Sequence, residues 1–265
     1  MDISKLMKKF HEDGYFVIEN GFSPNEINSM RARMQDIVAG KFKMQGRRFQ
    51  VDTDSGKYED VSSGEMIYRG PDVAYRKISD LEYDEVFLRG LQSDWLKKIC
   101  LNFVGDVVTI LRVTMMDKPA KGGTHLPWHQ DISMDWPTVK QPKFAIWFPL
   151  DDVTAASGTL QVVLGSHKHG MINRGHLLPE SLEDELAPKN KIIDVEIKAG
   201  SCLFFHPAIL HRSGINTTTS PRRAVNAILM DGPAIHTTRN KPYPVLFGDG
   251  HLRPEVVSEL IEIPR

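Results

Sequence analysis

The sequence predicts a mainly β fold with flanking helices (α+β), whose core is a sandwich or barrel of the jelly-roll or cupin kind. From Gly105 onward, short apolar runs rich in β-branched residues follow one another, each bounded by Gly, Pro, Asp or Asn. This pattern is typical of a sandwich or barrel. No helical stretch of adequate length separates the runs, which excludes a doubly wound sheet. Before Gly105, apolar residues keep helical spacing instead.

The amino-terminal part is expected to brace this core with helices. A first helix should end at Gly14, and its apolar stripe consists of Ile3, Leu6, Met7 and Phe10. Residues 15–22 have the composition of a strand. Ser23 and Glu26 form a capping box, so a second helix should begin there and end at Gly40.

Residues 41–66 carry charges and glycines without sustained periodicity, so we expect an irregular stretch that could serve as a lid in an enzyme. A helical block follows at about 84–103, interrupted near Ser93, whose hydroxyl is expected to cap the second piece. The strands of the core are expected at 107–116, 144–153, 158–166, 192–201, 202–211 and 222–232.

No internal repeat, low-complexity tract or linker divides the 265 residues, so a single domain is expected over 1–265. It should comprise a helical portion at about 1–104, a β-rich core at about 105–235 and a carboxyl-terminal extension at about 236–265.

The composition is that of an ordinary globular chain. Hydrophobic residues make up 41%, charged residues 25%, and the formal net charge is −1. This balance gives no electrostatic reason to expect nucleic acid or an anionic membrane as a partner. There is no signal-peptide core, and Cys100 and Cys202 lie in apolar sequence as reduced thiols would. We expect a cytoplasmic protein that acts on a small molecule; the sequence leaves its oligomeric state open.

Three residues form a candidate metal site. In an extended segment His129 and Asp131 point the same way while Gln130 faces away, and His211 on a later strand supplies a third ligand. Two imidazoles and one carboxylate suit Fe(II) with open positions, although such ligands also accept Zn(II), Mn(II) or Co(II). His206 lies five residues before His211, and strand alternation assigns it to packing on the opposite face.

Four stretches carry a family resemblance that spans nearly the whole chain. These are "FHEDGYFVIENGFSPNEI", "WHQD", "SGTLQVVLGSHKHG" and "AGSCLFFHPAILHRSGINTTTSPRRAVNAILM". The chain resembles the phytanoyl-CoA dioxygenase family of Fe(II)- and 2-oxoglutarate-dependent oxygenases, with Leu164 in place of the family's usual proline. The resemblance implies a double-stranded β-helix core, Fe(II) as cofactor, and 2-oxoglutarate and O₂ as co-substrates.

The resemblance also implies how 2-oxoglutarate is held. Arg222 follows His211 by eleven residues, the family's offset for the arginine that grips the C5 carboxylate, and a guanidinium can do so through two parallel hydrogen bonds. Its neighbour Arg223 should point to the opposite face. Ser213 resembles a hydroxyl contact and Trp147 a pocket aromatic, for which core packing is equally compatible with the bare sequence. Lys77 corresponds loosely to a lysine that reaches the co-substrate.

The carboxylate of Asp131 favours hydroxylation, because related halogenases carry Gly or Ala at that position. The substrate itself is left open, and the expected edge of its pocket consists of Met116, Met134, Asp135, Trp136, Arg112 and Arg239. For each arginine, a structural salt bridge is the competing interpretation. Two other functions remain: a cupin-like metalloenzyme that does not use 2-oxoglutarate, and a catalytically silent ligand-binding member of the fold.

Overall fold

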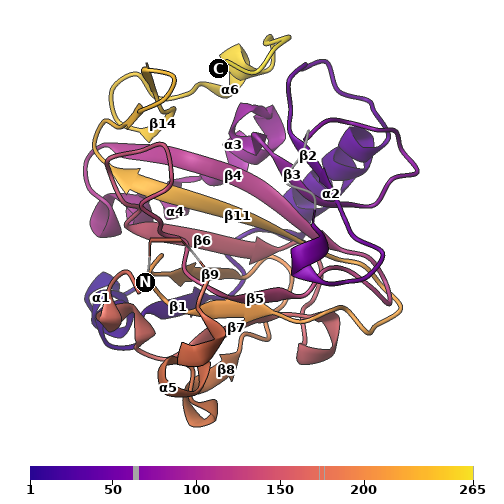
Figure 1. Ribbon diagram of the computed structural model, residues 1–265. Helices are drawn as coiled ribbons and strands as arrows, with labels where there is room; N and C mark the ends of the chain where they lie inside the picture. Colours follow the sequence, from indigo (N-terminus) through magenta and orange to yellow (C-terminus); the bar gives the residue numbers. More distant parts are fainter. Residues whose placement is uncertain (62–65, 173, 176, 265) are drawn as a thin grey trace.

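Two antiparallel sheets form the core of the computed structural model, which describes residues 1–61, 66–172, 174–175 and 177–264 (Figure 1). The larger sheet has the order β1-β9-β6-β11-β4-β3-β2, with β14 also paired to β4. Its strands are β1 Tyr15–Ile18, β2 Phe49–Val51, β3 Tyr75–Ser79, β4 Val108–Lys118, β6 Phe144–Pro149, β9 Cys202–Phe205, β11 Arg222–Asp231 and β14 Val245–Phe247.

The smaller sheet has the order β5-β10-β7-β8, and a separate two-stranded ribbon pairs β12 with β13. The strands are β5 Leu126–His129, β7 Leu160–Val163, β8 Ile192–Asp194, β10 His211–Ser213, β12 Ile235–His236 and β13 Lys241–Pro242. This arrangement of antiparallel sheets confirms the predicted mainly β fold with flanking helices.

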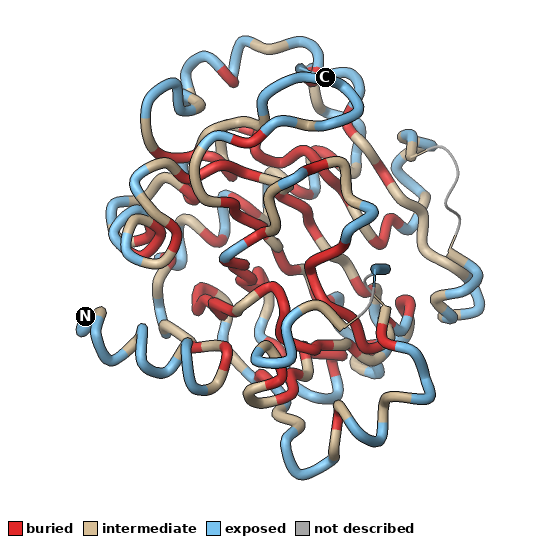
Figure 2. Tube along the Cα trace, turned by 60° about the vertical axis from the view of Figure 1, so that its left-hand side comes forward, coloured by how far each residue is buried: buried red, intermediate tan, exposed pale blue. Residues whose placement is uncertain are grey.

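Two main apolar layers hold the sheets and the helices together, and a smaller third cluster contains Trp128 and Leu210. One main layer lies between the large sheet and the helices and includes the stacked rings of Phe16 and Phe204. The other lies between the two sheets and includes Trp147, Phe205 and Ile228. Figure 2 shows buried backbone along the strands and exposed backbone along the outer loops and α1. Side chains that alternate along one strand therefore enter different layers.

The first two helices begin and end where local sequence chemistry predicts, whereas the short α5 and α6 were not predicted. The helices are α1 Ile3–Asp13, α2 Pro24–Val38, α3 Glu85–Leu91, α4 Asp94–Phe103, α5 Glu183–Leu186 and α6 Pro254–Val257. Gly14 ends α1 in the left-handed conformation (φ +86°), and Ser23 and Glu26 cap α2 reciprocally. Ser93 occupies the position before α4, but the expected cap is wrong, because its buried hydroxyl has no hydrogen-bond partner among the described residues.

The amino-terminal part contributes more β structure than its sequence pattern indicates. Besides β1, it supplies β2 and β3 to the large sheet. The stretch expected to be irregular therefore contains a strand, although its residues 62–65 lie outside the described part. Arg76 and Lys77 in the middle of β3 mask the apolar alternation by which a strand is recognised.

Candidate active site

The three predicted metal ligands meet between the sheets. β5 and β10 pair so that His129 lies opposite His211, and Asp131 follows two residues after β5 ends. One ligand atom from each residue lies within 4.8 Å of the others. Each residue is at most 5% exposed. Buried imidazoles and a carboxylate gathered at this spacing form a site that can hold one metal ion.

Backbone carbonyls orient both imidazoles. Nδ1 of His129 lies 2.9 Å from the carbonyl oxygen of Pro127, and Nδ1 of His211 lies 3.0 Å from that of Ile209. Because a carbonyl only accepts, each Nδ1 carries the proton and each Nε2 carries the lone pair. Both rings thus present Nε2 as the metal-binding nitrogen, the usual way a protein fixes a ligating histidine.

The Asp131 carboxylate is held at both oxygens. Arg112 donates from Nη2 to Oδ1 at 2.8 Å, and Asn226 donates from Nδ2 to Oδ2 at 3.2 Å. Oδ2 also lies 3.7 Å from Nε2 of His211, so it is the oxygen that faces the shared metal position. Burial opposes ionisation of Asp131, but Arg112 and the two imidazoles outweigh it and hold its pKa well below the usual range.

A cavity of about 190 Å³ opens beside these ligands. Ten of the expected site residues line it: His129, Asp131, His211, Arg222, Ser213, Trp147, Lys77, Met116, Trp136 and Arg112. The remaining expected residues lie elsewhere. The cavity therefore gathers the predicted metal ligands and the predicted co-substrate residues in one place.

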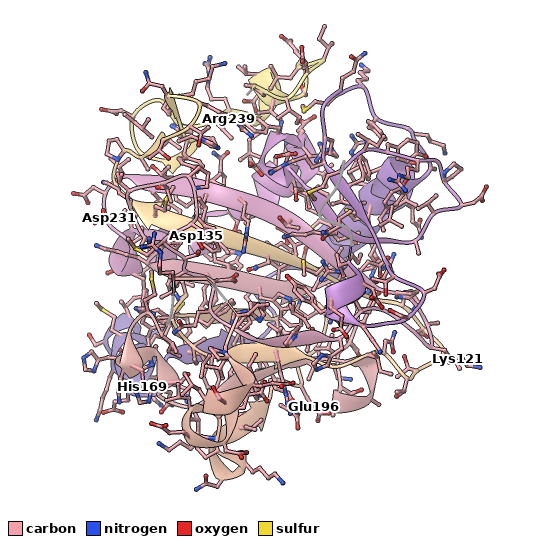
Figure 3. The ribbon with its side chains drawn as sticks, viewed as in Figure 1. Lys121, Asp135, His169, Glu196, Asp231 and Arg239 are labelled. Carbon is pink, nitrogen blue, oxygen red and sulfur yellow. The ribbon has the colours of Figure 1, made fainter. Side chains whose placement is uncertain are left out.

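Met134 and Asp135 were expected at the pocket edge, and the structure does not bring them there. The main-chain N–H of Met134 donates to the carbonyl of Arg174. The hydroxyl of Ser133 donates to the same carbonyl and accepts from the main-chain N–H of Asp135. This turn directs both side chains outward, and Met134 is 57% exposed. In Figure 3 the labels of Asp135 and Asp231 lie on the left of the view and that of Lys121 on the right.

Arg239 lies apart as well. It lines a second cavity of about 190 Å³, of which Arg112 and Trp136 form the wall shared with the first. The guanidinium carbon of Arg112 lies 4.8 Å from the centre of the Trp136 ring. Arg112 is thus committed to Asp131 and to an aromatic face, which matches the salt-bridge interpretation of this arginine more closely than that of a free substrate anchor.

Arg222 and Arg223 point to opposite faces of β11, as predicted. Arg223 forms a two-pronged ion pair with Asp151 at 2.7 and 2.9 Å. Arg222 is 2% exposed, lies 5.8 Å from the centre of the Trp147 ring, and donates from Nη2 to the carbonyl of Gly158. Its Nε is buried without a hydrogen-bond partner in the part of the chain that the structure describes. A buried guanidinium with an unused donor fits an incoming carboxylate.

Lys77 enters the cavity from β3. In the register of the sheet it lies opposite Met116 of β4, and both line the cavity wall. Burial, together with Arg112 and Arg76, lowers the pKa of Lys77 to about 7. Lys77 is therefore protonated most readily when an anion lies beside it.

Several cavity residues went unrecognised in the sequence. On β4, Thr114 and Lys118 continue the alternation of Arg112 and Met116, and on β11, Asn226 keeps the same alternation from Arg222. The period of two along each strand would have found them. No comparable signal exists for the wall formed by Gln50, Tyr58, Arg76, Asp117 and Thr124.

Comparison with known proteins shows which family resembles this chain. The model described as Phytanoyl-CoA dioxygenase (PhyH) matches residues 10–224. A probable phytanoyl-CoA dioxygenase of Caenorhabditis elegans is 26% identical over 246 residues, which cover 84% of this chain and 74% of that protein.

Two solved structures share the fold. EctD from S. alaskensis with bound Fe has a TM-score of 0.68 at 19% identity, covering 100% of this chain and 82% of that chain. The epimerase SnoN in complex with Fe³⁺, alpha ketoglutarate and nogalamycin RO has a TM-score of 0.66 at 18% identity, covering 88% and 85%. The family match confirms the enzyme class predicted from the sequence, an oxygenase of the 2-oxoglutarate-dependent kind. The chain belongs to the phytanoyl-CoA dioxygenase (PhyH) family.

Proposed function

We propose that this protein is an Fe(II)- and 2-oxoglutarate-dependent dioxygenase that hydroxylates an unactivated C–H bond of a small or medium metabolite, with release of succinate and CO₂. The observation that carries the proposal is one cavity that holds both the His129, Asp131 and His211 cluster and the unpaired Nε of Arg222. A metal site alone fits many reactions; a metal site beside a buried carboxylate receptor fits far fewer.

The protein residues have distinct tasks in this proposal. His129, Asp131 and His211 hold the iron on one side, which leaves positions open on the other. Arg222 binds the C5 carboxylate of 2-oxoglutarate, with Trp147 against the guanidinium and Ser213 and Lys77 as further contacts. When bound, the iron with 2-oxoglutarate and O₂ supplies the oxidant. The buried walls exclude water and fix the orientation of the substrate.

Asp131 supports hydroxylation over halogenation, because a carboxylate occupies the position that a halide would need. Arg112 and Asn226 keep that carboxylate ionised and oriented. The substrate is a small molecule in this proposal. Among the described residues, no helix is long and apolar enough to cross a membrane. The cytoplasmic location and the single-domain organisation expected from the sequence stay predictions.

O₂-dependent succinate release tests the proposal. The purified protein with Fe(II), 2-oxoglutarate and ascorbate should release succinate faster when a metabolite panel contains its substrate, and mass spectrometry should find that substrate heavier by one oxygen. His129→Ala should abolish both signals. A metabolite converted without consumption of 2-oxoglutarate would indicate the cupin-like alternative. Binding without any turnover would indicate the silent member of the fold.

A further inference from the structure

Arg76 is a buried guanidinium that forms no ion pair with any of the described residues. It is 8% exposed and lines the cavity from β3. Its Nη1 donates to Oε1 of Gln50 at 2.6 Å, and its guanidinium carbon lies 5.6 Å from the centre of the Tyr58 ring. Both partners are neutral. Burying a cation is costly unless an anion compensates it, so this arrangement calls for an anion.

The nearest candidate within the chain is Asp52, whose charge acts on Arg76 from outside ion-pair distance. Its Oδ1 accepts hydrogen bonds from the hydroxyl of Thr124 and the nitrogen of Thr53. Oδ2 of Asp52 is buried without a hydrogen-bond partner, and no ion pair joins Asp52 to Arg76 within the described ranges. The one side-chain hydrogen bond that Arg76 makes to the described residues is the bond to Gln50, and Arg76 lines the cavity.

The charged residues of the cavity wall also indicate that an anion binds there. Three arginines line the cavity against two aspartates: Arg76, Arg112 and Arg222 against Asp117 and Asp131. Two lysines also line it, but burial lowers the pKa of Lys77 to about 7 and that of Lys118 well below its usual value. Arg112 is paired with Asp131, and Lys118 donates to the carbonyl oxygen of Thr124. When the 2-oxo acid end of 2-oxoglutarate binds the metal, only its C5 carboxylate is free to contact the cavity wall. Arg222 binds that carboxylate in the proposed function. Of the three arginines, Arg76 is then the one with neither an ion pair among the described residues nor a carboxylate of 2-oxoglutarate.

We propose that Arg76, braced by Gln50 and Tyr58, binds an oxyanion of the primary substrate, a carboxylate or a phosphate. This inference rests on the proposed function and assigns its substrate class. A guanidinium fork matches either oxyanion through two parallel hydrogen bonds. Anchored at β3, the substrate would extend along the wall toward the metal ligands, and only a carbon at a fixed distance from its anionic end would reach them.

Calorimetric titration of the anaerobic Fe(II) and 2-oxoglutarate complex tests this, because Arg222 is then already occupied. The probes are hexanoate and phenyl phosphate, with hexanamide and phenol as their uncharged counterparts, all at constant ionic strength. At least one anion should bind tenfold or more tightly than its counterpart, and the preferred pair identifies the oxyanion. Arg76→Gln should weaken that anion by about tenfold or more, as expected for a charged hydrogen bond, and leave 2-oxoglutarate affinity within about twofold of wild type.

Two variants accompany Arg76→Gln. Arg76→Lys keeps the buried charge, and with it the fold, but loses the fork, so it should bind the anion with intermediate affinity. Arg212→Gln is the matched control, because Arg212 also bonds a glutamine side chain (Gln161, 2.6 Å) and lies over an aromatic ring (Trp128, 4.5 Å), but on the face of β10 opposite His211. It should leave anion binding unchanged.

The proposal is overturned if neither anion binds the wild-type complex, or if anion and counterpart bind equally. It is also overturned if Arg76→Gln lowers only the melting temperature, as a structural partner of Asp52 would, or if it abolishes binding of 2-oxoglutarate, which would make Arg76 the co-substrate anchor. Failure of the wild-type protein to bind 2-oxoglutarate at all would instead contradict the proposed function.

Discussion

Removal of the Arg112 guanidinium should weaken metal binding although Arg112 is not a ligand. Its Nη2 donates to Oδ1 of Asp131 at 2.8 Å, and the two side chains are 26% and 4% exposed. Hydrogen bonds to a charged group at such a site contribute about 1.5–3 kcal/mol. If that energy serves to hold Oδ2 toward the metal, its loss in Arg112→Gln should raise the dissociation constant for Fe(II) by about ten- to a hundredfold.

Anaerobic Fe(II) titration at constant pH, followed by calorimetry, measures this effect. Arg223→Gln is the control, because it breaks another arginine–aspartate ion pair, with Asp151, on the face of β11 turned away from the cavity. It should leave the Fe(II) affinity unchanged. If Arg112→Gln binds Fe(II) within about twofold of wild type while remaining folded, the carboxylate is oriented by other groups and the reasoning is wrong.

Three further predictions concern the stability of the folded protein. Gln130 makes three buried hydrogen bonds, to Gly170, Ala208 and Ile172, so Gln130→Leu should lower the free energy of unfolding in urea by about 2–4 kcal/mol; an unchanged value would show that water replaces them. Burial and His167 lower the pKa of His206 to about 4 from 6.5; because the unfolded state then takes up the proton first, stability should fall by about 2 kcal/mol between pH 7 and pH 5, and His206→Asn should lack this loss. Phe204 is 0% exposed and stacks on Phe16 at 4.9 Å, so Phe204→Ala should cost about 3–5 kcal/mol by thermal or urea unfolding, and a cost below 1 kcal/mol would mean that the layer closes over the gap.

The sequence is sufficient to predict those parts of the fold in which one local rule dominates. The capping box at Ser23 and the left-handed Gly14 are set within a few residues, so α1 and α2 match their predicted bounds. β4 and β11 are long and apolar and lie at the centre of the sheet, so they too were recognisable. β3 could not be recognised from its sequence, because charged residues in a strand usually indicate an exposed surface. Its Arg76 and Lys77 instead line a cavity.

In the candidate site, too, only the residues that follow a local rule could be predicted from the sequence. His129, Asp131 and His211 were found because ligand chemistry requires particular residue types at particular spacing. The partners of Asp131 were harder: Arg112 was expected near the substrate and Asn226 was not considered, since both come from other strands and meet the carboxylate only through the register of the sheet. Met134 and Asp135 were misplaced because proximity in sequence to Asp131 says nothing about the turn that directs them outward.

The central claim, that one cavity binds Fe(II) and 2-oxoglutarate together, is tested most directly by anaerobic absorption spectroscopy. Addition of 2-oxoglutarate to the Fe(II) protein should produce a metal-to-ligand charge-transfer band. In Arg222→Ala the same band should require a much higher 2-oxoglutarate concentration, whereas Arg223→Ala should resemble wild type. If no band forms in the wild-type protein, or if Arg222→Ala titrates as wild type does, the co-substrate site assigned to this cavity is wrong.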